Sequence, residues 1–197
     1  MREAQRFQLP SGRVVALVAL TVLEQLVAKR AGGTGTGYET SSAVTMAGLR
    51  ISLREIDGAA VRFDQLGGLE SRFKVRDLTA MQAAFQSLHI PAQPLAYTLT
   101  AGDALDSYEV TLEGGEKVTL RELAHPAFSR CMAQLESERG CPAAAEFVVG
   151  LAGLRASIAG IPSDNALWPY SARDTSGLVA LWGQIHGGTF TMVPAAV

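Results

Sequence analysis

Cysteine is scarce in this sequence, which has two in 197 residues, Cys131 and Cys141. Two cysteines cannot form the disulfide framework that holds many small secreted domains together. We expect Cys131 to lie within a helix and Cys141 just before the next one. Both are therefore predicted to be reduced thiols in a cytosolic protein.

Charged residues are also few: they make up 18% of the chain and leave a net charge of −2. A nucleic-acid-binding protein needs a basic stripe that replaces the counterions of the phosphates. We therefore expect no nucleic-acid partner. The charge is unevenly divided, because residues 1–98 carry a net +3 and residues 99–197 a net −5.

The apolar run VVALVALTVL (14–23) is about half as long as a membrane-spanning helix requires. Glu24 and Gln25 end it. Lys29 and Arg30 follow where a signal peptide would carry the small residues of its cleavage site. We expect neither a membrane segment nor a targeting segment. With 48% hydrophobic residues, the chain can still form a well-packed core.

The sequence does contain one motif twice. RDLTAMQAAFQSLH (76–89) aligns without gaps to RDTSGLVALWGQIH (173–186). Matched apolar positions recur at i, i+4 and i+7, which is typical of one face of an amphipathic helix. Phe85 aligns with Trp182, and we predict that both rings are buried at matching places.

Asp77 and Asp174 stand at the start of these two motifs. A carboxylate at a helix N-cap accepts hydrogen bonds from the backbone N–H groups of the first turn. We predict that both aspartates are structural helix caps. They are also the only carboxylates at matching positions, so an acid–base reaction would have to use them, and we favour the cap.

Two further pairs of segments match upstream, in the same order. The earlier pair alternates apolar and polar residues around a Gly-containing turn, which predicts β-hairpins. Each hairpin is followed by a predicted helix. The two segments of the later pair each form the end of a further predicted helix. The matched segments are 6–20 with 107–123 and 48–56 with 153–161, and the helices are predicted at 21–31, 38–54, 126–138 and 142–159.

These matches predict an α+β fold made of two pseudo-repeats. Each repeat is an N-terminal β-hairpin packed against about three α-helices. We place the first repeat at 1–95, a linker at 96–106 and the second repeat at 107–197. Units of about 90 residues bury enough surface to fold separately.

The Gly-rich stretch AGGTGTGYETSS (31–42) is a weak candidate for a phosphate site. It lacks the Gly-Lys-Ser/Thr ending of a P-loop and the spacing of the dinucleotide fingerprint. We interpret it as a flexible loop between helices. No G-x-S-x-G nucleophile motif occurs in the sequence either. We therefore predict no catalytic residue and no cofactor site.

The side chains of metal-binding type are three histidines and the two cysteines. His125, Cys131 and Cys141 have no recognised ligand spacing, while His89 and His186 end the two matched helices. We predict that the histidines lie at helix ends or on the surface and that the protein has no metal site.

Trp168 and Tyr170 lie in the irregular segment NALWPYSARD (165–174). Large aromatic residues in such a segment usually fill the core of their own domain. They are also the residues that dominate protein–protein interfaces. The sequence leaves both interpretations open.

The motifs resemble those of small tail-assembly and baseplate-hub assembly proteins of contractile-tailed bacteriophages. IAGIPSD (158–164) departs from the Ile-Asp-Gly form of that family, whose members usually have one copy of the unit. The motifs that carry the resemblance are FQLPSGRVV (7–15), SLREIDGAAV (52–61), VRDLTAMQAAF (75–85), VTLEGGEKVTLREL (110–123) and SARDTSGLVALW (171–182).

The resemblance implies a non-enzymatic protein that acts through protein–protein contacts in baseplate or hub assembly. Its partners would be other tail or baseplate proteins, including the tape measure or hub, in an assembly with several copies. It would occupy the virion tail baseplate, and the host cytoplasm during assembly. The alternative is a tail-assembly chaperone that holds the tape measure or other tail proteins and is absent from the mature particle.

Two other classes compete with this interpretation. A small hydrolase would need a cleft that joins Asp77 or Asp174 to a histidine and a nucleophile. The other class is a bacterial adaptor or a toxin-related binding module.

Overall fold

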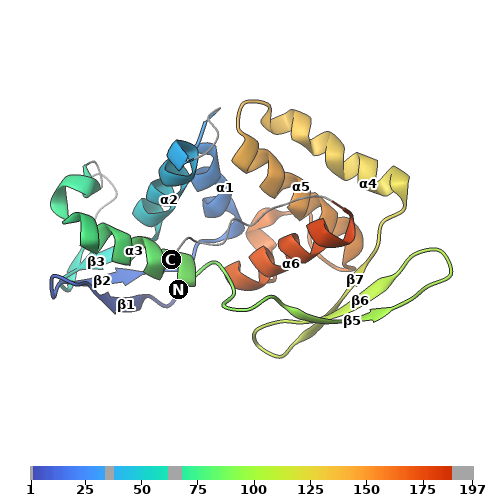
Figure 1. The fold of residues 1–197 in the computed structure, drawn as a ribbon, viewed down its shortest axis with the longest axis horizontal. Coiled ribbons are helices and arrows are strands. Elements are labelled where there is room, and N and C mark those ends of the chain that lie inside the picture. Colours follow the sequence, from blue (N-terminus) through green and yellow to red (C-terminus); the bar gives the residue numbers. More distant parts are fainter. Residues whose placement is uncertain (1, 34–37, 62–67, 188–197) are drawn as a thin grey trace. The chain divides into compact units, whose positions relative to one another are not determined.

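The computed structural model describes residues 2–33, 38–61 and 68–187 (Figure 1). The chain divides into two compact units, Met1–Ile90 and Pro91–Val197. Both units contain helices and small antiparallel sheets, so the α+β prediction is confirmed.

The described residues of the first unit form a four-stranded antiparallel sheet and three α-helices (Figure 1). The strands lie in the order β1-β2-β3-β4, so β3 pairs with the second strand of the hairpin. The elements are β1 (Gln5–Gln8), β2 (Val14–Leu17), α1 (Val22–Arg30), α2 (Tyr38–Ser52), β3 (Leu53–Ile56), β4 (Ala59–Ala60), the 3-10 helix η2 (Leu69–Arg72) and α3 (Val75–Ser87).

The β1–β2 hairpin forms where the sequence predicts it. Leu9 N–H donates to Arg13 O at 2.8 Å, and Gly12 N–H donates to Leu9 O at 2.8 Å. Gly12 has a φ of 88°, which glycine adopts without steric cost.

The helix predicted at 38–54 ends at Ser52, and the chain then continues as β3. Asp57 and Gly58 form the two-residue turn to β4, with φ of 54° and 79°. An Asp-Gly pair with positive φ at both positions is favoured in tight hairpins because its twist matches that of the strands. The sequence predicted a helix over 38–54 and no strand here, so β3 and β4 are additions that only the structure shows.

Up to residue 187, where the described part of the chain ends, the second unit forms a three-stranded antiparallel sheet in the order β5-β6-β7 and three α-helices. Here the additional strand pairs with the first strand of the hairpin. The elements are β5 (Ala96–Thr100), β6 (Ser107–Thr111), β7 (Lys117–Arg121), α4 (His125–Met132), the 3-10 helix η3 (Ala133–Glu138), α5 (Pro142–Ser157), the 3-10 helix η4 (Asn165–Leu167) and α6 (Ala172–Ile185).

The segment predicted as a linker, 96–106, contains β5. All five residues of this strand pair with β6, and the strand belongs to the second unit. The boundary between the units therefore follows Ile90, before the predicted end of the first repeat at residue 95. The β6–β7 hairpin repeats the turn geometry of the first, with Gly115 at a φ of 83°.

Each unit has its own apolar core. Leu17, Leu49 and Met81 are among the fully buried residues of the first, and Val110, Leu154 and Trp182 of the second. The burial predicted for Trp182 is confirmed, because its exposed fraction is 0%. Phe85 is only half-buried, packed against the edge of the first core.

A glycine lies under each of these two rings. A Cβ atom at Gly48 would meet the Phe85 ring, and one at Gly153 would meet the Trp182 ring. These two glycines are aligned in the matched segments 48–56 and 153–161, and both allow a close approach between the last two α-helices of their unit. Descent of the two units from one ancestral unit stays a prediction, with such matched contacts as its support.

Candidate functional site

Asp77 and Asp174 are the predicted helix caps, and the structure corrects that role. Each aspartate is the third residue of its helix, because α3 begins at Val75 and α6 at Ala172. The N-cap residues are Lys74, which makes no side-chain cap bond, and Ser171, whose hydroxyl accepts from Asp174 N–H.

Both carboxylates accept a hydrogen bond from the turn of the hairpin in their own unit. Ser11 N–H donates to Asp77 Oδ1 at 3.0 Å, and Glu113 N–H donates to Asp174 Oδ1 at 2.9 Å. The first unit uses Ser11 because Pro10 before it has no N–H to donate. Each aspartate therefore joins the last helix of its unit to the hairpin turn.

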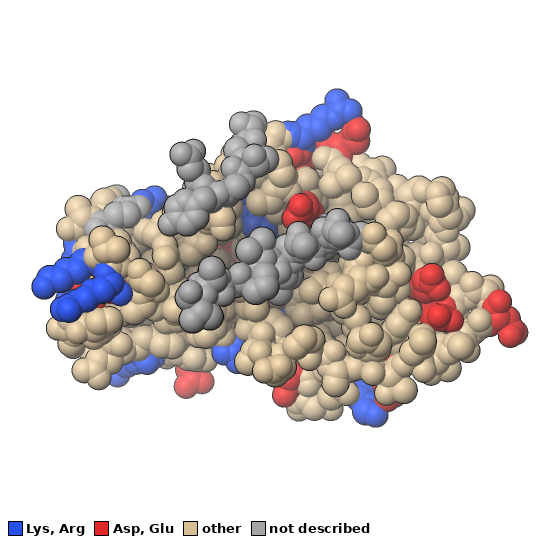
Figure 2. Space-filling view, in the orientation of Figure 1, with Lys and Arg blue, Asp and Glu red and all other residues tan. Residues whose placement is uncertain are grey.

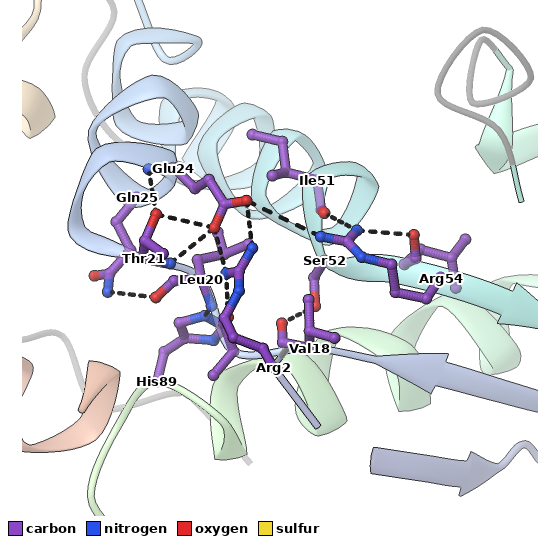
Figure 3. Close-up of polar contacts among 12 residues, drawn as sticks. Arg2, Val18, Leu20, Thr21, Glu24, Gln25, Ile51, Ser52, Arg54 and His89 are labelled. Carbon is purple, nitrogen blue, oxygen red and sulfur yellow. Dashed lines mark hydrogen bonds and ion pairs between the residues drawn. The ribbon is translucent and has the colours of Figure 1, made fainter. Parts of the chain in front are cut away.

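A histidine makes a second link between the same elements in the first unit (Figure 3). Leu20 N–H, just beyond β2, donates to His89 Nε2 at 2.8 Å. The other ring nitrogen, Nδ1, lies 2.7 Å from Phe85 O. Because Nε2 accepts, a neutral ring carries its proton on Nδ1 and donates it to this carbonyl.

His186 makes the same contacts in the second unit. Leu123 N–H donates to His186 Nε2 at 2.9 Å, and His186 Nδ1 lies 2.9 Å from Trp182 O. We call each aspartate–histidine pair a hairpin clasp: Asp77 with His89 in the first unit and Asp174 with His186 in the second.

The contacts of the two histidines with the hairpins were not predicted from the sequence. The prediction that His89 and His186 lie at helix ends is confirmed, because His186 directly follows α6 and His89 lies two residues after α3. Their ungapped alignment was the available signal. Their partners are backbone N–H groups of leucines, which nearly any residue would supply, so the sequence does not reveal the contact.

We predict that Asp77→Ala lowers the free energy of unfolding of the first unit by about 2 kcal/mol, because it removes a charged acceptor from a hairpin N–H. Asp77 is 2% exposed, so water does not readily replace the carboxylate. Chemical denaturation followed by circular dichroism measures the change. Asp77→Asn keeps an oxygen acceptor and is the matched control. Equal losses in the two variants would contradict the clasp role.

Polar contacts also fix the segment between β2 and α1 in the first unit (Figure 3). Val18 N–H donates to Ser52 O at 3.0 Å, and Ser52 Oγ donates to Val18 O at 2.6 Å. Gln25 Nε2 donates to Leu20 O at 3.4 Å. Together with the His89 contact, these bonds hold a non-helical, non-strand segment in place.

Glu24 completes the capping box of α1. Thr21 N–H donates to Glu24 Oε2 at 2.8 Å, and Glu24 N–H donates to Thr21 Oγ1 at 3.3 Å. Arg2 forms a bidentate pair with this carboxylate, with Nη2 2.7 Å from Oε1 (Figure 3). Burial raises the pKa of Glu24, but the hydrogen bonds from Arg2 and Thr21 outweigh it and lower the pKa below its usual 4.5.

Asp57, in the β3–β4 turn, also has a lowered pKa. Val14 N–H donates to its Oδ1 at 2.9 Å, and Arg13 Nε donates to its Oδ2 at 2.8 Å. The Val14 bond is the main cause of the lowering, followed by the Arg13 bond.

These lowered pKa values predict acid sensitivity of the first unit. A carboxyl whose pKa is lower in the folded state stabilises that state above its unfolded pKa, and the contribution is lost as pH falls through the folded pKa. Stability should therefore fall as pH drops below about 4.5. In the double variant Glu24→Gln, Asp57→Asn the fall should be smaller. Urea midpoints measured from pH 6 to pH 3 test this, and an unchanged slope would contradict it.

The described histidines and cysteines do not form a metal-binding cluster. Over residues 2–33, 38–61 and 68–187, no group of three His, Cys, Asp or Glu side chains is placed to hold a metal ion. Cys131 and Cys141 are both buried, and burial raises the pKa of the Cys131 thiol. The Gly-rich segment 31–42 is described only at its ends, since residues 34–37 lie outside the described chain.

Trp168 and Tyr170 pack against the core of the second unit and are partly exposed. Trp168 Nε1 donates to Thr175 Oγ1 at 2.8 Å, and the guanidinium of Arg155 lies 5.2 Å from the Trp168 ring centre. Their structural role is thus visible, while a role at an interface stays a prediction.

The face of the molecule drawn in Figure 2 is weakly charged. On the face drawn in Figure 2, uncharged residues cover most of the area, and Lys and Arg side chains occur singly or in small groups. Within the described residues, no helix combines the length and the apolar character needed to cross a membrane.

No protein-family model, curated protein or solved structure matches the chain. Inference about function therefore rests on the contacts described above and on the resemblance of the sequence motifs.

Proposed function

We propose that this protein is a non-enzymatic tail protein of a contractile-tailed bacteriophage and acts through protein–protein contacts in baseplate or hub assembly. The observation that carries the proposal is the hairpin clasp, which occurs in both units. The aspartate and histidine found at matching positions are the residues that a duplicated active site would have used. Each of the four side chains accepts a bond from a backbone N–H group of its own unit, and Asp174 also accepts one from the hydroxyl of Ser171 at the start of its own helix.

Two similar units in one chain suit a protein that links others. When one unit binds, the second is held near its own target at a high effective concentration, so the linked pair binds more tightly than either unit alone. Baseplates and hubs offer repeated sites of this kind. We propose tail proteins, including the tape measure or hub, as partners, and neither nucleic acid nor membrane.

A tail-assembly chaperone is the second candidate, and exposed apolar side chains favour it. Leu23 and Val27 lie one turn apart on α1 and are 44% and 57% exposed. A chaperone that holds the tape measure would use such a surface transiently and would be absent from the mature particle.

The location of the protein separates the two candidates. Quantitative mass spectrometry would compare purified phage particles with the extract of infected cells. A stoichiometric amount in particles, enriched in isolated baseplates, supports the built-in component. Presence in the extract alone, in complex with the tape measure, supports the chaperone. Absence of any association with tail proteins in both samples would overturn the proposal.

A further inference from the structure

Strand β5 is an edge of the second unit's sheet, and all five of its residues are exposed (Figure 1). Tyr97 lies opposite Val110 on β6, and Leu99 lies opposite Tyr108. Directly paired residues share one face of a sheet, so Tyr97 and Leu99 extend the face that carries the buried Val110. They remain 52% and 51% exposed, so the core-side face of the sheet is uncovered at β5.

Natural proteins protect edge strands with charge, proline, bulges or short length. The other described edges follow this rule: β1 carries Arg6, β7 carries Lys117 and Arg121, and β4 has two residues. β5 reads AYTLT, without charge or proline, and its register with β6 is continuous over all five residues. Among the described edges, it alone is long, uncharged and regular.

The sequence of β5 is complementary to itself. In an antiparallel pair centred on Thr98, this residue faces Thr98 of the second copy and Tyr97 faces Leu99 of the second copy. The aromatic–aliphatic pairs lie on one face and the threonine pair on the other, and both kinds of pair stabilise sheets. Beyond the strand, Ala101 faces Leu95, so no like charges meet.

We propose that β5 is a self-association edge, which pairs antiparallel with β5 of a second copy about a twofold axis at Thr98. Both sheets then join into one continuous sheet, and each Tyr97 covers a Leu99. A twofold contact requires such a self-complementary patch. The inference uses the second unit alone and does not depend on the proposed function.

The dimer is expected to be weak, because one five-residue strand buries less than the roughly 1,200 Å² of a standard interface. We therefore expect a dissociation constant on the order of 10–1,000 µM. Over a protein concentration of about 5–500 µM, analytical ultracentrifugation should show the mean mass rise from 20.8 kDa toward twice that value.

Charge at the central residue tests the register. Thr98 is paired with Glu109, so Thr98→Glu would align four carboxylates across the dimer. This variant should lose self-association, and Thr98→Lys should also lose it because two ammonium groups would face each other. An equimolar mixture of the two variants should associate more strongly than either alone, since opposite charges then meet.

Thr119→Glu is the matched control. Thr119 lies on β7 and pairs with Glu109 from the side opposite Thr98. Like Thr98, it is an exposed threonine. The control variant should associate like the wild type. A wild type that stays monomeric over the whole range overturns the proposal and leaves the edge for a segment of another protein. Unchanged association of Thr98→Glu, or no gain on mixing, overturns it as well.

Discussion

Trp182→Ala is expected to lower the free energy of unfolding of the second unit by about 3–5 kcal/mol. The ring is fully buried, packs on the backbone at Gly153 and stacks 5.9 Å from Phe128 and 4.8 Å from His186. Its removal leaves a cavity between two helices that cannot easily close. Urea denaturation, with near-ultraviolet circular dichroism for the second unit, measures the loss.

Phe85→Ala is the matched comparison for Trp182→Ala. Phe85 occupies the aligned position in the first unit but is half-buried, so its loss should cost about 2 kcal/mol. A loss below about 1 kcal/mol for Trp182→Ala would mean that this ring does not hold the core of the second unit together.

His89→Ala is expected to destabilise the first unit by about 3 kcal/mol. The substitution removes the acceptor of Leu20 N–H, and a buried N–H left without a partner costs about 1–3 kcal/mol. Phe85 O loses the His89 contact but still accepts from Leu88 N–H. The substitution also removes a ring contact with Phe85 at 4.2 Å. Thermal and chemical denaturation of the variant would measure the effect.

His186→Ala serves as the internal comparison, because the same bonds are made by a more exposed ring. Water can replace part of what is lost, so we expect about 1–2 kcal/mol. His89→Gln offers an amide oxygen near the Nε2 position and should recover part of the stability. If His89→Ala were no more harmful than His186→Ala, burial would not set the strength of the clasp.

Periodicity predicted the helices well and the short strands poorly. The helices α1, α2, α3, α5 and α6 lie within a few residues of the expected ranges, because each has an apolar stripe or a continuous apolar run. The helix predicted at 126–138 changes to 3-10 geometry after Met132. β3 and β5 were missed because four or five residues carry too little periodicity to distinguish a strand from a loop.

The contacts of the candidate site were only partly predictable. The sequence singled out Asp77 and Asp174 by their repetition, but it assigned them to their own helices. Their partners are N–H groups in hairpin turns more than 60 positions away in the chain. Nearly every residue type supplies a backbone N–H donor, so only the folded structure shows which one is used.

The additional strand joins opposite sides of the two hairpins: β3 lies beside β2, and β5 lies beside β6. The two sheets therefore have different edge strands, which are β1 and β4 in the first unit and β5 and β7 in the second. A partner that binds both units in the same way would have to contact their helices. A partner that pairs with an edge strand would distinguish one unit from the other. The two units are therefore alike in their hairpins and unlike at the borders of their sheets.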